Sequence, residues 1–187
     1  EVDSTNNYAM ARISEGPVAE GTTWFAWHQT SGKGQRGKHW ESTPGENVML
    51  SIVLKPLTLS PSDQFMLSAA VALAVRDLLA GYTTRPVSIK WSNDLYIDDK
   101  KAGGILIENL IRGDTWNYAV VGIGLNVNQV CVPPGLPNPG SLAAATGARY
   151  EVLDGAAALS RCVGKRYTGL TRERFPQVLA EYRASLY

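Results

Sequence analysis

A basic, glycine-rich segment at residues 32–40 (GKGQRGKHW) separates two runs of strand-like composition, residues 22–29 (TTWFAWHQ) and 46–54 (ENVMLSIVL). Glycine adopts positive φ angles readily and lets the backbone approach a ligand closely. Lys33, Arg36 and Lys38 are cations that can bind phosphate or carboxylate groups. The segment therefore predicts a loop between two strands that binds an anion.

Two phosphate-binding fingerprints match the letters of this loop but not its context. Its glycines spell the G-x-G-x-x-G of dinucleotide-binding folds, and with Lys38 they spell most of a P-loop, in which His39 replaces the Ser or Thr. Both motifs need a helix directly after the glycines, because the helix N-terminus binds the phosphate. Residues 41–45 (ESTPG) are typical of a turn, and a strand follows them. We therefore expect neither nucleotide-binding fold.

Composition excludes several further classes of function. The 187 residues carry a net charge of +1, so there is no general attraction to nucleic acid or membranes. No apolar run has transmembrane length, and no signal peptide is visible. Cys131 and Cys162 lack metal-ligand spacing, and His28 and His39 are isolated. We expect two free thiols, no metal cluster of His and Cys, and a cytoplasmic location.

The order of apolar patterns predicts an α+β fold, with a mixed, largely antiparallel sheet and helices packed on one side. The expected strands are residues 22–29, 46–54, 87–91, 95–97, 101–108 and 116–126; the expected helices are one that ends at residues 16–17, then 61–82, 141–147, 151–167 and one that begins near 171. Residues 61–82 are apolar almost all round, which predicts a buried helix. Residues 128–139 are rich in proline and predict a loop.

Polar side chains stand where several of these elements begin or end. Ser4 or Thr5 suits the N-cap of the first helix, which we take as the main role and which is compatible with ligand contact. Gln29 ends a strand directly before the basic loop, so its amide can face the same ligand. A carboxylate at Asp94 and an amide at Asn126 suit a Mg²⁺-nucleotide site, although Asp94 alone is equally consistent with a turn residue.

Glycine recurs on two neighbouring predicted strands, at Gly103, Gly104, Gly122 and Gly124. Glycine inside a strand costs stability, so these positions indicate a bulge or the close approach of a ligand. Crowding against the buried helix explains any one of them equally well.

Five motifs, taken together, resemble in sequence and order those of the biotin protein ligases. They are residues 3–6 (DSTN), 32–40 (GKGQRGKHW), 90–94 (KWSND), 101–106 (KAGGIL) and 122–126 (GIGLN), and the resemblance extends from residue 3 to about 147. It implies a biotin/lipoate ligase-like catalytic domain over residues 1–187, without a DNA-binding domain before it and without the small β-domain that often follows in the family. It also implies two reactions: biotin and Mg-ATP form biotinyl-5′-AMP, and a lysine of a biotin-acceptor domain of a biotin-dependent carboxylase then attacks this adenylate.

The resemblance also assigns roles to residues. Biotin would contact Ser4, Thr5, Gln29, Gly32, Lys33, Trp40, Gly104, Gly122 and Gly124, with the first three at the ureido ring and Trp40 along the aliphatic tail. ATP and its phosphates would contact Lys33, Arg36, Lys38, Lys101 and Asn126, and Lys33, Arg36 and Lys101 would act in catalysis. The metal would be Mg²⁺, with Asp94 and Asn126 as its protein ligands.

The motifs depart from the family pattern at a few positions, and other functions stay open. Lys33, Gln35 and Lys38 replace arginines, and Gln35 also loses the charge; Ser92 replaces the proline of K-W-P-N-D, which loosens one turn. The expected partners are biotin, ATP and an acceptor domain, without nucleic acid or membrane, and a homodimer is left open. The alternatives are a lipoate or octanoate ligase on the same fold and a non-enzymatic module that binds an anion or nucleic acid.

Overall fold

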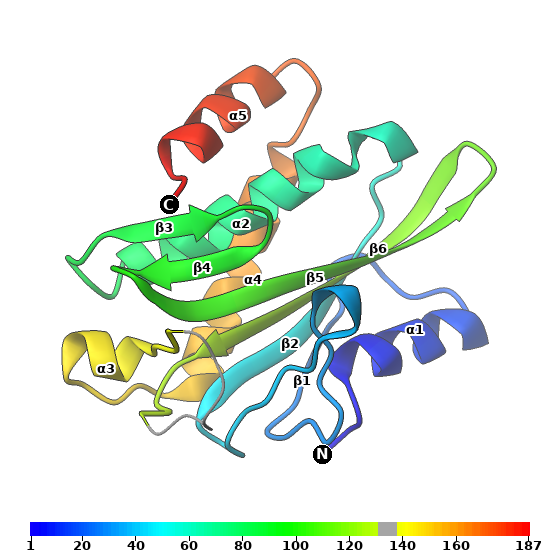
Figure 1. The fold of residues 1–187 in the computed structure, drawn as a ribbon. Coiled ribbons are helices and arrows are strands. Elements are labelled where there is room, and N and C mark those ends of the chain that lie inside the picture. Colours follow the sequence, from blue (N-terminus) through cyan, green and yellow to red (C-terminus); the bar gives the residue numbers. More distant parts are fainter. Residues whose placement is uncertain (131–137) are drawn as a thin grey trace.

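Six strands form one sheet in the order β1-β2-β6-β5-β4-β3, and each neighbouring pair in it is antiparallel. The computed structural model describes residues 1–130 and 138–187 (Figure 1). The strands are β1 (Thr23–Phe25), β2 (Asn47–Leu54), β3 (Val87–Lys90), β4 (Asp94–Ile97), β5 (Lys100–Arg112) and β6 (Thr115–Asn126). The helices are α1 (Thr5–Glu15), α2 (Gln64–Ala80), α3 (Leu142–Thr146), α4 (Val152–Thr168) and α5 (Phe175–Ala184).

The main core lies between one face of the sheet and the helices α2 and α4 (Figure 1). Eleven of the 17 residues of α2 are buried, which confirms the expectation from its apolar sequence. A single 3-10 turn, Pro61–Asp63, precedes α2, and Ser60 and Asp63 form a capping box there. Hydrogen bonds from the Ser60 backbone N–H and from Arg172 hold the pKa of the Asp63 carboxyl below its usual value.

The first helix packs on the opposite face of the sheet. Ala9 of α1 is fully buried against Val53 and Val120, whereas their neighbours Ile52 and Val121 point into the main core. All eight residues of β2 are buried because helices cover both of its faces. The predicted fold class is confirmed, with the difference that α1 does not share the side of the other helices.

The strand β5 extends well beyond its neighbour β4. The pairing of β4 with β5 ends at Asp94 and Gly104, whereas β5 pairs with β6 as far as Arg112 and Thr115. The tight turn between β5 and β6 places Gly113 at φ 56°, a conformation that glycine tolerates. Beyond Gly104, β5 therefore has no described strand on the side of β4, and Glu108 in this part contacts Lys33 of the basic loop.

Most predicted elements are confirmed, with shifted ends. The strand expected at residues 22–29 shortens to β1, and the sheet edge at β3 gains a parallel bridge between Ile89 and Leu186. Cys162 is a free thiol, as expected, and burial raises its pKa. The predicted loop at 128–139 and the thiol of Cys131 fall largely or wholly outside the described residues. Among those described, no helix combines the length and apolar character that a membrane span requires.

Candidate active site

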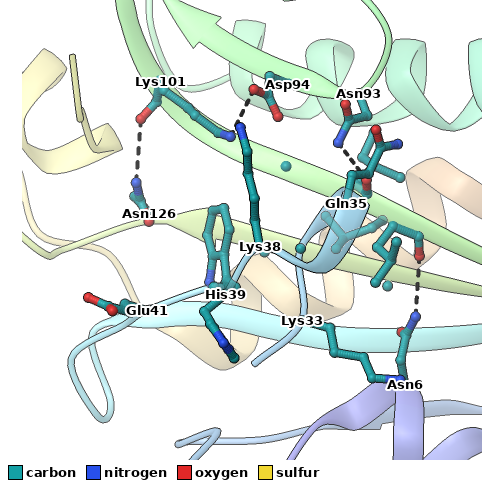
Figure 2. Close-up of a pocket in the computed structure, with 18 of the residues that line it drawn as sticks. Asn6, Lys33, Gln35, Lys38, His39, Glu41, Asn93, Asp94, Lys101 and Asn126 are labelled. Atoms are coloured by element: carbon teal, nitrogen blue, oxygen red, sulfur yellow. Dashed lines mark hydrogen bonds and ion pairs between the residues drawn. The ribbon is translucent and has the colours of Figure 1, made fainter. Parts of the chain in front are cut away.

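A pocket of about 440 Å³ opens between the start of α1, the basic loop, the β5–β6 face of the sheet and the turn before β4 (Figure 2). It brings together residues that lie far apart in the sequence. Of the predicted site residues it is lined by Ser4, Thr5, Gln29, Lys33, Arg36, Lys38, Trp40, Asp94, Lys101, Gly104, Gly122, Gly124 and Asn126. Gly32 is the predicted residue that does not line it.

The basic loop closes on itself as a small hairpin. The backbone N–H of Trp40 donates to the Gly32 carbonyl at 2.8 Å, and that of Gly34 donates to the Lys38 carbonyl at 2.6 Å. A side chain at Gly32 would collide with the Trp40 carbonyl, so this glycine is needed to close the loop. The tip is a short 3-10 turn, Gln35–Gly37, and β2 follows the loop, which agrees with the exclusion of both nucleotide-binding fingerprints.

Glycines form the floor of the pocket where Trp40 lies over the sheet. Gly104 and Gly124 are directly opposite each other on β5 and β6. A side chain at Gly124 would overlap the indole of Trp40, and one at Gly104 would come within 3.2 Å of it. The indole N–H is buried and has no hydrogen-bond partner among the described residues. These two positions are therefore glycine because Trp40 packs closely on them from the pocket side. Crowding against α2 does not explain them.

One end of the pocket, here called the polar end, is lined by the uncharged polar side chains of Ser4, Thr5, Asn6 and Gln29. Behind them lie Ser51 and Glu108, which bond to these residues without lining the pocket. Gln29 Oε1 accepts from the Thr5 backbone N–H at 2.7 Å and lies 3.1 Å from the Thr5 hydroxyl. The Ser51 hydroxyl lies 2.8 Å from Thr5 Oγ1 and 2.6 Å from Asn6 Oδ1. Asn6 Nδ2 donates to Glu108 Oε2 at 2.7 Å.

Ser4 differs from its predicted role as a helix cap. It occupies the N-cap position of α1, but its side chain makes no capping hydrogen bond. The residue is 2% exposed and lines the pocket, and its hydroxyl has no partner within residues 1–130 and 138–187. A hydroxyl that lines the pocket and caps no helix N–H is available to a ligand, so the geometry favours the ligand-contact role over capping. Just before it, hydrogen bonds from the Asn7 side chain and the Ser4 backbone lower the pKa of Asp3.

The opposite end, here called the charged end, consists of Lys38, Asp94, Lys101 and Asn126. Lys101 Nζ lies 2.8 Å from Asp94 Oδ2, and Figure 2 shows Lys38 extending from the loop toward this pair. Asn126 Nδ2 donates to the Gly140 carbonyl at 2.9 Å. This assembles a carboxylate and cations around a space suited to anionic oxygens.

Lys33 lies away from this charged end. Its ammonium lies 3.4 Å from Glu108 Oε1. Figure 2 shows Lys33 extending toward Asn6, at the polar end of the pocket. The structure thus separates Lys33 from Lys101, although the resemblance groups both as catalytic. A role for Lys33 at the phosphates requires this contact with Glu108 to open.

The expected Mg²⁺ ligands fit an ion that is bound mainly by phosphate. The described residues contain no group of three or more His, Cys, Asp or Glu side chains suited to a metal. Asp94 supplies one carboxylate, whose second oxygen pairs with Lys101, and Asn126 has its NH₂ group engaged, which leaves its amide oxygen as the ligand atom. Mg²⁺ needs few protein carboxylates when phosphate oxygens and waters complete its shell.

Sequence reasoning missed the residues that complete the polar end. Asn6 lies within the motif at residues 3–6, but the motif alone predicts no contact for its side chain. Ser51 is the one hydroxyl in an apolar strand, which is a signal of a buried hydrogen bond. Glu108 gave no such signal, because an acidic residue near the end of a predicted strand is ordinary.

Comparison with known proteins adds an independent line of observation. Residues 1–126 match the sequence profile of the biotin/lipoate A/B protein ligase family. The bifunctional ligase/repressor BirA of Escherichia coli (strain K12) is 35% identical over 128 residues, which are 68% of this chain and 38% of BirA. The biotin–[acetyl-CoA-carboxylase] ligase of Mycobacterium tuberculosis (strain ATCC 25618 / H37Rv) is 31% identical over 189 residues, 98% of this chain and 68% of that protein.

Solved structures agree with the sequence relatives. The biotin protein ligase from Aquifex aeolicus, in complex with biotin and ATP, superposes with a TM-score of 0.84 and 27% identity, and covers 99% of this chain and 75% of its own. The chain therefore has the same fold as a structure that holds both ligands. It spans well under half the length of BirA.

Proposed function

This chain belongs to the biotin/lipoate A/B protein ligase family, and from that premise we propose that it attaches biotin to a lysine of a biotin-acceptor domain in two steps. In the first step the biotin carboxylate attacks the α-phosphorus of ATP, which gives biotinyl-5′-AMP and releases pyrophosphate. In the second step the lysine amine attacks the acyl carbon. The amide C–N bond forms as the C–O bond to AMP breaks, and the amine loses a proton.

The observation that carries this proposal is the division of one pocket into a polar end, an aromatic middle and a charged end. A ureido ring has N–H donors and a carbonyl acceptor, and Ser4, Thr5 and Gln29 offer matching hydroxyl and amide groups. Trp40, over the glycine floor, offers a flat apolar surface for the aliphatic tail. The tail then directs the carboxylate toward Lys101. Lipoate has no ring N–H, so the buried hydroxyls favour biotin over the lipoate alternative.

At the charged end, the proposed chemistry joins two anions. Lys101 lies where it can contact both the biotin carboxylate and the α-phosphate, and a cation so placed stabilises the charge that develops in the transition state. Mg²⁺, held by the ATP phosphates with Asp94 and Asn126, would neutralise phosphate charge during the attack. Arg36 and Lys38 line the pocket from the loop and would bind phosphate as the loop covers the adenylate and excludes water.

The wider context of the reaction is part of the same proposal. Residues 1–187 act as the catalytic domain, and the acceptor is a carboxylase domain, as the name of the Mycobacterium tuberculosis relative suggests. The free thiol of Cys162 favours a cytoplasmic location. No described feature points to nucleic acid as a partner, and the partners proposed are biotin, ATP and the acceptor.

The test is pyrophosphate exchange into ATP in the presence of Mg²⁺ and either biotin or lipoate. Exchange that depends on biotin supports the proposal, and exchange that depends only on lipoate refutes it. Titration with biotin, lipoate and an oligonucleotide, each followed by calorimetry, separates the ligases from a nucleic-acid-binding module. Omission of Mg²⁺ should abolish exchange while biotin binding remains.

A further inference from the structure

The basic loop forms one wall of the pocket along almost its whole length. Residues 33–36 and 38–40 line the cavity, and the Trp40 indole lies over the glycine floor between the polar end and the charged end. A ligand that reaches from one end to the other therefore lies against this loop. Its path into or out of the pocket widens when the loop moves away from the sheet.

Few bonds hold the loop against the rest of the chain. Within the described residues, positions 33–39 make two hydrogen bonds or ion pairs with residues outside the loop. The Ser92 hydroxyl lies 3.5 Å from Gln35 Oε1, which is the limit for a hydrogen bond. The Lys33 ammonium lies 3.4 Å from Glu108 Oε1, and these two groups carry opposite charges. The pair of Lys33 and Glu108 is therefore the stronger of the two attachments.

Glu108 is a rigid anchor for this pair. Its backbone lies in β5, opposite Val120 of β6, and its second carboxylate oxygen accepts from Asn6 Nδ2 at 2.7 Å. Asn6 is 3% exposed and also donates to the Leu106 carbonyl, so α1 and β5 stay joined without the help of Glu108. Figure 2 shows Lys33 extending from the loop toward Asn6. The carboxylate is thus fixed to the sheet through one oxygen and holds Lys33 with the other.

We propose that Glu108 is a positioning residue for the basic loop: through Lys33 it holds the loop closed in the free chain and slows the passage of biotin in both directions. This ion pair is here called the latch. The proposal rests on the proposed function, which places biotin against the loop. Because the latch is formed before any ligand binds, it resists entry and exit alike and cancels from the dissociation constant.

The latch and a direct attraction to the ligand predict opposite changes when Lys33 loses its charge. A cation that attracts the biotin carboxylate speeds association and slows release, so its loss slows association. A cation that holds the loop closed slows both steps, so its loss speeds both. Glu108 is the mirror case: loss of a repelling charge alone would slow release, whereas loss of the latch speeds it.

The main test is the double variant Lys33→Gln with Glu108→Gln, which removes the latch and leaves the net charge unchanged. We expect its association and release rates for biotin each to rise about two- to fivefold, as for loss of a partly exposed ion pair, and the dissociation constant to change by less than about twofold. Stopped-flow mixing with biotin and a chase of labelled biotin measure the two rates. Unchanged rates, slower association, or faster release alone would overturn the proposal.

The matched control is Glu46→Gln with Arg149→Gln. It also removes an ion pair without a change in net charge, neither residue lines the pocket, and the Glu46 side chain is 26% exposed against 29% for Glu108. Both rates should stay at those of the parent chain. Lys33→Arg keeps a cation that can bond a carboxylate through two N–H groups, so its rates should equal or fall below those of the parent. Faster rates in Lys33→Arg, or an equal rise in the control, would contradict the latch.

The outcomes for the two proposals differ. If the parent chain does not bind biotin, the proposed function fails and the latch fails with it. If the parent binds biotin and the double variant keeps the parent's rates, only the role of Glu108 fails. Thermal unfolding shows whether the double variant is folded. If it is not, Lys33→Gln alone is the test, because Lys33 is on the loop and its side chain is 41% exposed. Faster association in Lys33→Gln supports the proposal, and equal or slower association overturns it.

Discussion

At the polar end of the pocket Ser4, Thr5 and Asn6 are 2–4% exposed, whereas at the charged end the side chains of Asp94 and Lys101 are 27% and 31% exposed. Hydrogen bonds already join α1, β2, β5 and Gln29 at the polar end without a ligand. At the charged end Asn126 bonds to the Gly140 carbonyl, but the charged side chains of Asp94 and Lys101 are held by one described ion pair. Partly exposed pairs of this kind contribute little to stability. A ligand therefore meets an ordered set of hydrogen-bonding groups at the polar end, and its own charges must order the side chains at the charged end. Substitutions at the two ends should therefore affect affinity and rate separately.

The largest expected effect comes from Lys101→Ala at the charged end. Its ammonium acts on charge that develops in the transition state, so its loss should slow adenylate formation about a hundredfold, or by about 3 kcal/mol. Biotin affinity should stay measurable, because the ureido contacts lie at the polar end. Single-turnover adenylation and biotin calorimetry check this. Lost biotin binding with a normal rate of adenylation would reverse the assignment of the two ends.

Gly122→Ala tests whether the polar end is as rigid as its bonds suggest. The added methyl would overlap the buried Asn6 amide, and overpacking of this kind costs about 2 kcal/mol of unfolding free energy. Biotin affinity should fall as well, since displacement of Asn6 breaks the hydrogen bond to Ser51, which in turn bonds to Thr5. Urea denaturation and calorimetry on the same variant measure both effects.

Gly164→Ala is the matched control for that substitution. Gly164 lies inside α4, and a side chain there meets nothing within 4 Å. Alanine in a helix interior should stabilise the protein by about 0.5–1 kcal/mol and leave biotin affinity unchanged. A loss of affinity in Gly164→Ala as large as in Gly122→Ala would show that the effect at Gly122 is not local.

The residues of the loop and the charged end can be predicted from the sequence, whereas those that complete the polar end cannot, for a physical reason. The five motifs identified the loop, the glycine floor and the charged end, because those residues are close together in sequence or end on neighbouring strands. The polar end joins Asn6 to Glu108 across 102 positions and to Ser51 across 45. Only the register of β2, β6 and β5 places these side chains together, and register is a property of the folded sheet.

The sequence also does not predict which face of the sheet α1 covers. The first helix was placed correctly along the chain, but its amphipathic pattern does not say which face it covers. The apolar run of residues 48–54, interrupted only by Ser51, carried the missing signal, because a strand buried on both faces loses the alternation of apolar and polar residues. For Lys33 the sequence predicts the kind of partner but not its identity. Its charge predicts an anion of the ligand, and in the structure the anion is the carboxylate of Glu108.

Asp94→Asn removes the one described ion pair of the charged end. Loss of a group that holds a metal or its ligands typically lowers metal affinity ten- to a hundredfold, so the Mg²⁺ concentration for half-maximal exchange should rise by at least about tenfold. Stability should change by less than about 1 kcal/mol, because the pair is partly exposed. Mg²⁺ titration of exchange activity, beside urea denaturation, measures the two quantities. A large stability loss with an unchanged Mg²⁺ requirement would assign Asp94 a structural role.

The smallest expected effect concerns Gln35 at the tip of the loop, which connects the two ends. The family places an arginine at this position, and here a neutral amide lies 3.5 Å from the Ser92 hydroxyl (Figure 2 shows its place beside Asn93). A charge-assisted hydrogen bond contributes about 1.5–3 kcal/mol and a neutral one about 0.5–1.5 kcal/mol. Gln35→Arg should therefore slow release of preformed biotinyl-adenylate about five- to thirtyfold if association is unchanged.

The measurement for Gln35→Arg is a chase of labelled adenylate with unlabelled ligand, run on the parent chain and on the variant. Lys38→Gln serves as a comparison, since it removes a cation from the same loop and should speed release. Slower release from Gln35→Arg means that the loop of this chain holds its intermediate less firmly than an arginine would allow. Equal or faster release means that Arg36 and Lys38 already hold the closed loop, and that the charged end is more organised in the adenylate complex than its exposure in the free chain indicates.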